Sequence, residues 1–355
     1  MKAKTSYHLR NSLYRKIKQP TLTQKEGPEF MRHKLYTLGE LLIDFLPVSH
    51  PENGSFTHAF SPVAGGAPAN VAASVCKLGI PSYFIGKVGE DFFGSFLLDT
   101  LQSLGVGTDY VSTTKEGNTA LAFVSLAQDG ERSFTFYRKQ CADSLLAKED
   151  IPKDAFSHNS IFHHGSISLI SSPSKEATEY AIDCAQKAGS IISYDPNIRM
   201  LLWPDAMAIK NIVPKYFKYA HIIKLSDEEV EFLFDSCSDE IIQSLFSSET
   251  KLLLVTKGKM GAIAYTPKDK IFLQGFNVDA VDTTGAGDAF MAGILYQLLF
   301  RNITLDTIDK VLEDTALLKE MLLFANANAA LTTTKKGAFA ALPSLQEVET
   351  LIHTS

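Results

Sequence analysis

The chain has 355 residues, of which 45% are hydrophobic and 21% charged, with a formal net charge of −6 at pH 7. This length allows one large α/β domain or two smaller ones, and no run approaches the roughly 18 apolar residues of a membrane-spanning helix. The first 30 residues carry seven Lys or Arg and two Glu, which leaves 27 basic and 38 acidic side chains in the remainder. This acidic body argues against nucleic acid as the main ligand, because a phosphate backbone selects a basic surface.

The basic segment of residues 1–30 lacks the apolar centre of a secretory signal, and Met31 follows it. We interpret it as a leader added for expression, with a basic targeting presequence as the alternative, and expect it to be disordered. We expect residues 31–355 to form a single domain. The cysteines have no metal-ligand spacing, so we expect reduced thiols and a cytoplasmic protein. They are Cys76, Cys141, Cys184 and Cys237.

The body begins with an apolar run, residues 34–45, that predicts one buried strand with Asp44 at its end. Open α/β sheets bind ligands at such strand ends, although a turn-forming aspartate fits equally well. A short strand is predicted at 56–63, and Gly65 and Gly66 then precede an alanine-rich helix. Two glycines before a proline let the backbone approach a small polar ligand, and Asn70 offers a donor and an acceptor there.

Residues 118–138 interrupt the alternation of strands and helices. Segments 120–126 and 133–137 predict a β-hairpin with an Asp-Gly turn within 128–131. Together with strands from about 44–63, this hairpin predicts a small sheet that covers the substrate as a lid and excludes water. One face of that sheet would be exposed, which makes it the expected contact of a homodimer.

From residue 160 onward, strands again alternate with helices. The expected strands are at 160–164, 191–194, 221–225, 251–256, 262–266 and 270–276, and the expected helices include 174–187 and those of 306–330. This alternation predicts an α/β fold with a mostly parallel central sheet and helices on both faces. Right-handed crossovers place the ends of the parallel strands along one edge of the sheet, which is the predicted site.

The stretch 281–290 lies between a strand predicted at 276–281 and a buried helix predicted at 289–300. A helix that begins inside a glycine turn presents unpaired N–H groups and the positive end of its dipole to an anion. Asp288, in the first turn, would repel that anion unless it acts on a neighbouring group. Removal of a proton from an attacking hydroxyl is the obvious task. A helix-capping role for Asp288 fits the local sequence equally well.

Two motifs, Gly65-Gly66-Ala67-Pro68-Ala69-Asn70 and Asp282-Thr283-Thr284-Gly285-Ala286-Gly287-Asp288, occur in the order and separation typical of one family. With segments at 136–143, 194–204, 226–233 and 324–327, they make the chain resemble the ribokinase-like, phosphofructokinase-B sugar kinases, and among these the fructokinases. The resemblance covers residues 34–345. It implies a ribokinase-like fold and ATP-dependent phosphorylation of a sugar, at the 6-hydroxyl of D-fructose.

The resemblance also implies roles for single residues. Asp288 is the expected general base, and the backbone amides of Gly285, Ala286, Gly287 and Asp288 are the expected anion hole. The expected sugar-binding residues are Asp44, Gly65, Gly66, Asn70, Arg138 and Arg199, with a surface ion pair as the alternative for either arginine. The expected nucleotide-binding residues are Ser226, Thr256, Gly258, Gly261 and Asn326. The expected cations are Mg²⁺, held through water by Glu229, and K⁺ at Asp282 and Thr284, in members that need it.

Other functions stay open at this point. The nearest is a family kinase for 2-keto-3-deoxygluconate, ribose or a nucleoside, and Ser226, where many ribokinases carry Asn, argues against ribokinase itself. A non-catalytic sugar sensor is less favoured, because a sensor needs no base. A Rossmann-type site would need a third glycine after Gly287 and a position after the first strand. The chain has no Walker A sequence.

Overall fold

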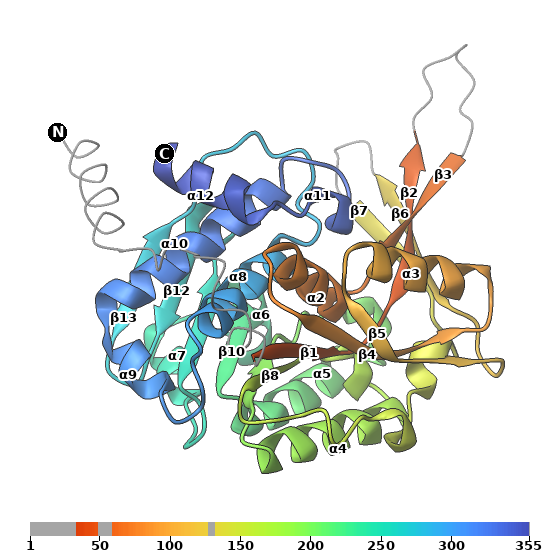
Figure 1. Cartoon of the computed structure of the whole chain (residues 1–355), viewed down its shortest axis with the longest axis horizontal. Helices are drawn as coiled ribbons and strands as arrows, with labels where there is room; N and C mark the ends of the chain where they lie inside the picture. The colour runs from red at the N-terminus through yellow and green to blue at the C-terminus, as the bar shows by residue number, and fades with distance from the viewer. Residues whose placement is uncertain (1–32, 49–58, 127–131, 355) are drawn as a thin grey trace, which may run out of the picture.

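The computed structural model describes residues 33–48, 59–126 and 132–354. The predicted leader at 1–30 and the predicted hairpin turn at 128–131 lie outside these ranges. The described residues form a nine-stranded sheet in the order β13-β12-β11-β10-β9-β8-β1-β4-β5 and a separate four-stranded sheet in the order β3-β2-β6-β7 (Figure 1). This architecture confirms the predicted α/β fold with a small additional sheet.

The large sheet is parallel from β5 to β11, and β12 and β13 extend it antiparallel. Side chains of β11 project from both faces of the sheet. Leu252 and Leu254 belong to the core on one face, and Leu253 and Val255 belong to the core on the other. Because helices cover both faces of the sheet, the sequences of such strands are continuous apolar runs. The strands are β1 (Lys34–Leu38), β4 (Ser82–Gly89), β5 (Gly107–Thr114), β8 (Ser160–His164), β9 (Ile191–Tyr194), β10 (Ile222–Ser226), β11 (Leu252–Thr256), β12 (Gly261–Tyr265) and β13 (Lys270–Gln274).

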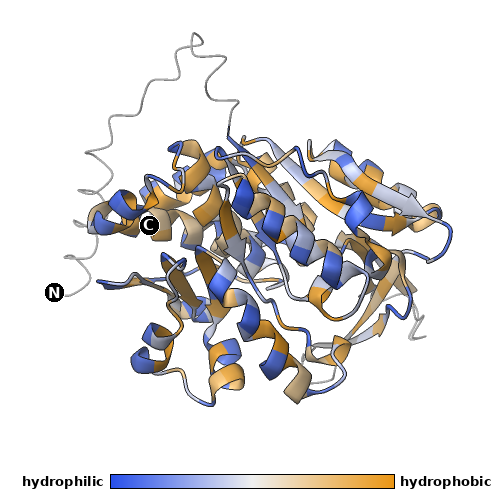
Figure 2. Ribbon diagram, turned by 90° about the horizontal axis from the view of Figure 1, so that it is seen from below, coloured by the Kyte–Doolittle hydropathy of each residue, from blue (hydrophilic) through white to orange (hydrophobic). Residues whose placement is uncertain are grey.

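Helices bury apolar sides against each face of the large sheet, and Figure 2 shows the outer helices with both hydrophobic and hydrophilic stretches. One face carries α2 (Ala67–Lys77), α8 (Ala286–Phe300), α9 (Ile308–Glu313), α10 (Thr315–Thr332) and α12 (Leu345–Thr354). The other carries α4 (Ser174–Lys187), α5 (Ala206–Ile212), α6 (Asp227–Phe234) and α7 (Asp239–Ser244). A third core joins α3 (Phe92–Ser103) and α11 (Ala338–Ala341). Short 3₁₀ turns lie at 142–145, 148–150, 167–169, 200–202, 213–219 and 258–260.

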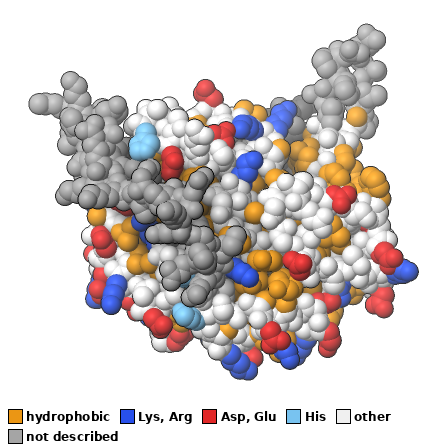
Figure 3. All heavy atoms as spheres, viewed as in Figure 1, with side chains coloured by type: hydrophobic (Ala, Val, Ile, Leu, Met, Phe, Trp, Pro, Cys, Tyr) orange, Lys and Arg blue, Asp and Glu red, His pale blue; other side chains and the backbone are white. Residues whose placement is uncertain are grey.

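The small sheet, called the lid below, consists of β2 (Leu42–Val48), β3 (Ala59–Gly65), β6 (Ala120–Leu126) and β7 (Arg132–Tyr137). Its outer face carries an aromatic cluster in which the rings of Phe45 and Phe123 stack with centroids 4.6 Å apart. Phe60 and Tyr137 pack edge-on against Phe123 and are 40% and 61% exposed. Figure 3 shows hydrophobic side chains gathered over α3 and the adjoining lid strands.

The single strand predicted at 34–45 is wrong. β1 ends at Leu38 in the large sheet, and the chain then crosses to β2 in the lid. Asp44 therefore lies inside a lid strand and not at the end of a large-sheet strand. Since Leu38, Leu41 and Ile43 are all buried, hydrophobicity does not mark the crossing.

The strand predicted at 276–281 is also wrong. β13 ends at Gln274, where its pairing with β12 stops. The backbone amides of Val281 and Asp282 instead donate to the carbonyl of Thr333, at 2.7 and 3.0 Å, which attaches this segment to the end of α10. Helix α8 begins at Ala286, three residues earlier than the predicted start at residue 289.

Candidate active site

Helix α8 begins at the centre of the site with Gly285 in a left-handed conformation, φ 77°. The amide of Ala286 donates to the carbonyl of Thr283 at 3.2 Å, so this amide is already used. The amides of Gly287 and Asp288 have no hydrogen-bond acceptor among the described residues. These two N–H groups, at the positive end of the helix dipole, are suited to an anion.

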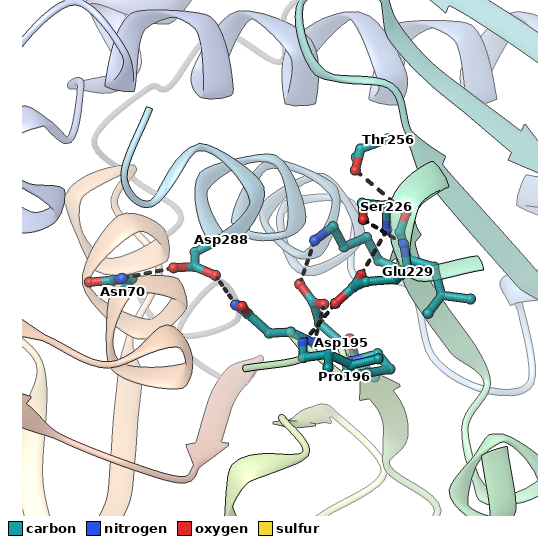
Figure 4. Close-up of polar contacts among 12 residues, drawn as sticks. Asn70, Asp195, Pro196, Ser226, Glu229, Thr256 and Asp288 are labelled. Atoms are coloured by element: carbon teal, nitrogen blue, oxygen red, sulfur yellow. Dashed lines mark hydrogen bonds and ion pairs between the residues drawn. The ribbon is translucent and has the colours of Figure 1, made fainter. Parts of the chain in front are cut away.

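Asp288 is buried and held by two amide side chains. Its Oδ2 accepts from Nδ2 of Asn70 at 2.7 Å, and its Oδ1 accepts from Nδ2 of Asn197 at 2.8 Å. Figure 4 shows Asp288 facing Asn70 across the gap between α8 and α2. Burial raises the pKa of Asp288 above its ordinary value, against the opposing effects of Asn70, Lys224, Arg199 and Asn197. A raised pKa makes this carboxylate a stronger base near neutral pH.

A cavity of about 540 Å³ opens beside Asp288, between the lid and the edge of the large sheet. Among the predicted sugar-binding residues, Asp44, Gly66, Asn70 and Arg199 line it. Gly65 lies behind Asp44, because a Cβ atom at Gly65 would come within 2.2 Å of Oδ2 of Asp44. The cavity therefore brings together residues from β2, α2, α8 and the segment after β9.

The cavity also contains groups that sequence reasoning missed. Glu40 follows β1, lines the cavity and accepts from the amide of Ala67 at 2.8 Å. Burial raises the pKa of Glu40 to about 7 and the pKa of Asp44 to about 6. Asn197, with a φ of 45°, also lines it. In the sequence, the Asp-Pro-Asn turn after β9 indicates Asn197 as a candidate. Glu40 has no such indication, because it lies inside the strand predicted at 34–45.

The two predicted arginines have different surroundings. Arg199 is exposed, lines the cavity and acts electrostatically on Asp44. Arg138 is partly buried, and its Nε lies 2.6 Å from Oδ2 of Asp143, so it forms an ion pair. Arg138 lines a neighbouring cavity, together with Lys139 and Ser172, and not the cavity beside Asp288.

A second cavity, of about 640 Å³, lies on the other side of the α8 N-terminus. Its lining includes four of the residues predicted to bind nucleotide, Thr256, Gly258, Gly261 and Asn326. Ser226 lines the first cavity instead. Thr283 and Gly287 line both cavities, so the two spaces meet at the first turn of α8.

Glu229 and Ser226 close the N-terminus of α6 as a capping box. The hydroxyl of Ser226 accepts from the amide of Glu229 at 3.1 Å, and Oε2 of Glu229 accepts from the amide of Ser226 at 2.8 Å. Oε1 of Glu229 accepts from the amide of Ile198 at 2.7 Å. Each oxygen keeps a lone pair, and Glu228 and Glu229 both line the first cavity, which fits a cation held through water.

Asp282 lies at the base of the glycine turn and is buried. Its Oδ1 accepts from the amide of Thr284 at 2.8 Å, and its Oδ2 accepts from the amide of Gly337 at 3.0 Å. These bonds hold segment 281–285 against segment 333–337. Within the described ranges, no group of three or more His, Cys, Asp or Glu could hold a metal ion.

A buried ion pair that sequence reasoning missed lies below this turn. Nζ of Lys224, near the end of β10, is 3.0 Å from Oδ2 of Asp195, and the side chains are 6% and 3% exposed. Burial alone would lower the pKa of Lys224, but Asp195, Glu229 and Asp288 together raise it above its ordinary value. Lys224 is therefore an ammonium group at neutral pH.

Comparisons with known proteins identify the family of the chain. The pfkB family carbohydrate kinase model matches residues 32–345. The protein named probable fructokinase-5 from Arabidopsis thaliana is 43% identical over 320 residues, which cover 90% of this chain and 97% of that protein. Within the described ranges, every helix is too short or too polar to span a bilayer.

Solved structures give the same result. Fructokinase with bound ATP from Xylella fastidiosa matches with a TM-score of 0.84 at 37% identity, covering 91% of this chain and 98% of that one. A double mutant of Vibrio cholerae O395 fructokinase, in a fructose-, ADP- and potassium-bound form, matches with a TM-score of 0.80 at 32% identity, covering 91% and 99%. The predicted ribokinase-like fold is confirmed, and the chain belongs to the pfkB family of carbohydrate kinases.

Proposed function

We propose that this chain transfers the γ-phosphoryl group of ATP to the 6-hydroxyl of D-fructose. One observation carries the proposal: a carboxylate suited to act as a base, Asp288, lies where two cavities meet at a helix N-terminus. The choice of fructose is supported by 43% identity to a probable fructokinase and by the fructose and ADP in the similar structure from V. cholerae.

In the proposed reaction, the sugar occupies the first cavity and ATP the second. Asp288 accepts the proton of the 6-hydroxyl as its oxygen attacks the γ-phosphorus, and the bond to the β–γ bridging oxygen breaks to release ADP. The amides of Gly287 and Asp288 donate to the phosphoryl oxygens as charge develops on them. Asn70 and Asn197 hold the base in place.

The remaining predicted roles follow the same division. Asp44, Gly65, Gly66 and Asn70 would hold sugar hydroxyls with Arg199, while Arg138 would have the alternative role of an ion pair, with Asp143. Thr256, Gly258, Gly261 and Asn326 would line the path of the nucleotide in the second cavity, and Ser226, which lines the first cavity, would meet the nucleotide at its phosphate end. Glu229 would hold Mg²⁺ through water, and the ion, when bound, neutralises phosphate charge. Asp282 and Thr284, with carbonyls near 332–340, would hold K⁺.

A coupled assay of ADP formation over a panel of sugars, with and without K⁺, tests the substrate. We expect fructose to exceed 2-keto-3-deoxygluconate, ribose and nucleosides in kcat/KM by at least about tenfold. A higher kcat/KM for another acceptor would show that the chain is a kinase for that acceptor instead. No turnover with any acceptor would favour a sugar-sensing protein.

The Asp288→Ala variant tests the base. Loss of a general base typically costs about 10²–10⁴ in rate, so turnover should nearly vanish. Nucleotide affinity, measured by calorimetry, should change little because Asp288 lines only the sugar cavity. An active Asp288→Ala enzyme would contradict the assignment.

We further propose that residues 31–355 act as one domain and that two copies associate through the outer face of the lid. The exposed rings of Phe60 and Tyr137 support this contact. A cytoplasmic location is proposed from the free cysteines, Cys76, Cys141, Cys184 and Cys237.

A further inference from the structure

Lys224 has more hydrogen-bond donors than the fold uses. Its ammonium carries three N–H donors, and the described residues give it one ion pair, with Oδ2 of Asp195 at 3.0 Å. A lysine is rarely buried to this degree unless its charge has a function or a full set of partners. Because Lys224 also lines the first cavity, its other two donors are available to a bound ligand.

The ammonium lies beside the amides that the proposed anion hole uses. A Cβ atom built on Gly287 would come within 3.0 Å of Nζ of Lys224. Gly287 lines both cavities, and its amide has no acceptor among the described residues. The absence of a side chain at 287 therefore lets a fixed positive charge approach the point where the two cavities meet.

We propose that Lys224 is a catalytic residue whose ammonium donates to a non-bridging oxygen of the phosphoryl group during its transfer, beside the amides of Gly287 and Asp288. Asp195 is a positioning residue that holds the ammonium in place. The inference rests on the proposed phosphoryl transfer but not on the identity of the sugar. Lys224 stays protonated throughout, because the proton of the acceptor hydroxyl goes to Asp288, so the balance of the reaction is unchanged.

A purely structural role would have a different signature. If Lys224 only neutralises Asp195, Lys224→Met leaves a buried carboxylate unpaired, and the double variant Lys224→Met/Asp195→Asn removes both charges and restores turnover. If Lys224 contacts the phosphoryl group, the double variant folds but stays slow. We expect kcat to fall by about 10²–10³-fold in both variants, the usual effect of losing one donor to a developing oxyanion.

Binding of a phosphoryl mimic provides a readout independent of turnover. ADP affinity is measured by calorimetry with fructose and Mg²⁺ present, with and without aluminium fluoride, which occupies the place of the transferring group. The wild-type chain should bind ADP more tightly when aluminium fluoride is added. The double variant should keep the affinity for ADP alone and lose most of that gain.

Lys87→Met serves as the matched control. Lys87 is also a lysine of the large sheet in a largely buried ion pair, with Nζ 2.6 Å from Oδ2 of Asp150, and it lines neither cavity. This variant should lower the unfolding midpoint but keep the aluminium fluoride gain. Restored turnover in the double variant, or an unchanged gain, would overturn the role of Lys224. Absence of turnover in the wild-type chain with every acceptor would instead overturn the proposed function.

Discussion

Asp44 lines the proposed sugar cavity, and the pKa of its carboxyl group is raised. Burial raises its pKa to about 6, while Arg199 opposes that shift and Asp282 adds to it. The protonated form dominates below this value, and a protonated carboxyl accepts sugar hydroxyls less well than a carboxylate does. We therefore expect kcat/KM for the sugar to fall as pH drops through about 6.

The pH profile of Asp44→Asn tests this assignment. The variant should have a higher KM for the sugar, and the limb near pH 6 should disappear from its kcat/KM profile. A limb that persists unchanged in Asp44→Asn would belong to another carboxyl group of the site, such as Asp288 or Glu40.

The start of helix α2 depends on the backbone at Gly66. Its φ is 123°, and a Cβ atom there would lie 2.3 Å from the carbonyl oxygen of Glu40. Gly66→Ala should displace the first turn of α2, and with it Asn70, which holds Asp288. We expect a higher KM for the sugar and a lower kcat.

Gly79→Ala, just beyond the other end of α2, is the matched control. Gly79 has a φ of 103°, but no atom of the described residues lies within 4 Å of the position that a Cβ atom would take. Gly79→Ala should lose roughly 1 kcal/mol of stability from its positive φ, and Gly66→Ala should lose more because its Cβ atom would also overlap the Glu40 carbonyl, as measured by urea unfolding. Equal sugar KM values in the two variants would show that the α2 start does not position Asn70.

How far sequence predicts such elements differs along the chain. The helix of the 281–290 motif was predictable because a long apolar run follows it, and Asn70 was predictable from the glycine motif. Lys224 was not, because a lysine within β10 has no sequence signal until its partner Asp195, directly after β9, is known. The crossing after β1 was hidden because both sheets bury their strands there.

At the scale of the molecule, the lid's outer face bears on oligomeric state. Phe60, 40% exposed, belongs to its aromatic cluster, and a charge there would be desolvated in a lid-to-lid contact. We expect Phe60→Glu to convert the proposed dimer into a monomer by light scattering. Phe272→Glu, on β13 of the large sheet and 52% exposed, should leave the mass unchanged. A monomeric wild-type chain would contradict the lid contact.

The sharing of Thr283 and Gly287 by both cavities has a stereochemical consequence. Because one turn of helix separates the two cavities, ATP and the sugar must be bound at the same time. The phosphoryl group then passes directly from the oxygen of ADP to the oxygen of the sugar. In double-reciprocal plots of initial rate against ATP at several sugar concentrations, the lines should therefore intersect. Parallel lines would require a covalent phosphoenzyme. With ATP made chiral at the γ-phosphorus by oxygen isotopes, the sugar phosphate should have inverted configuration, and retention would require two successive displacements.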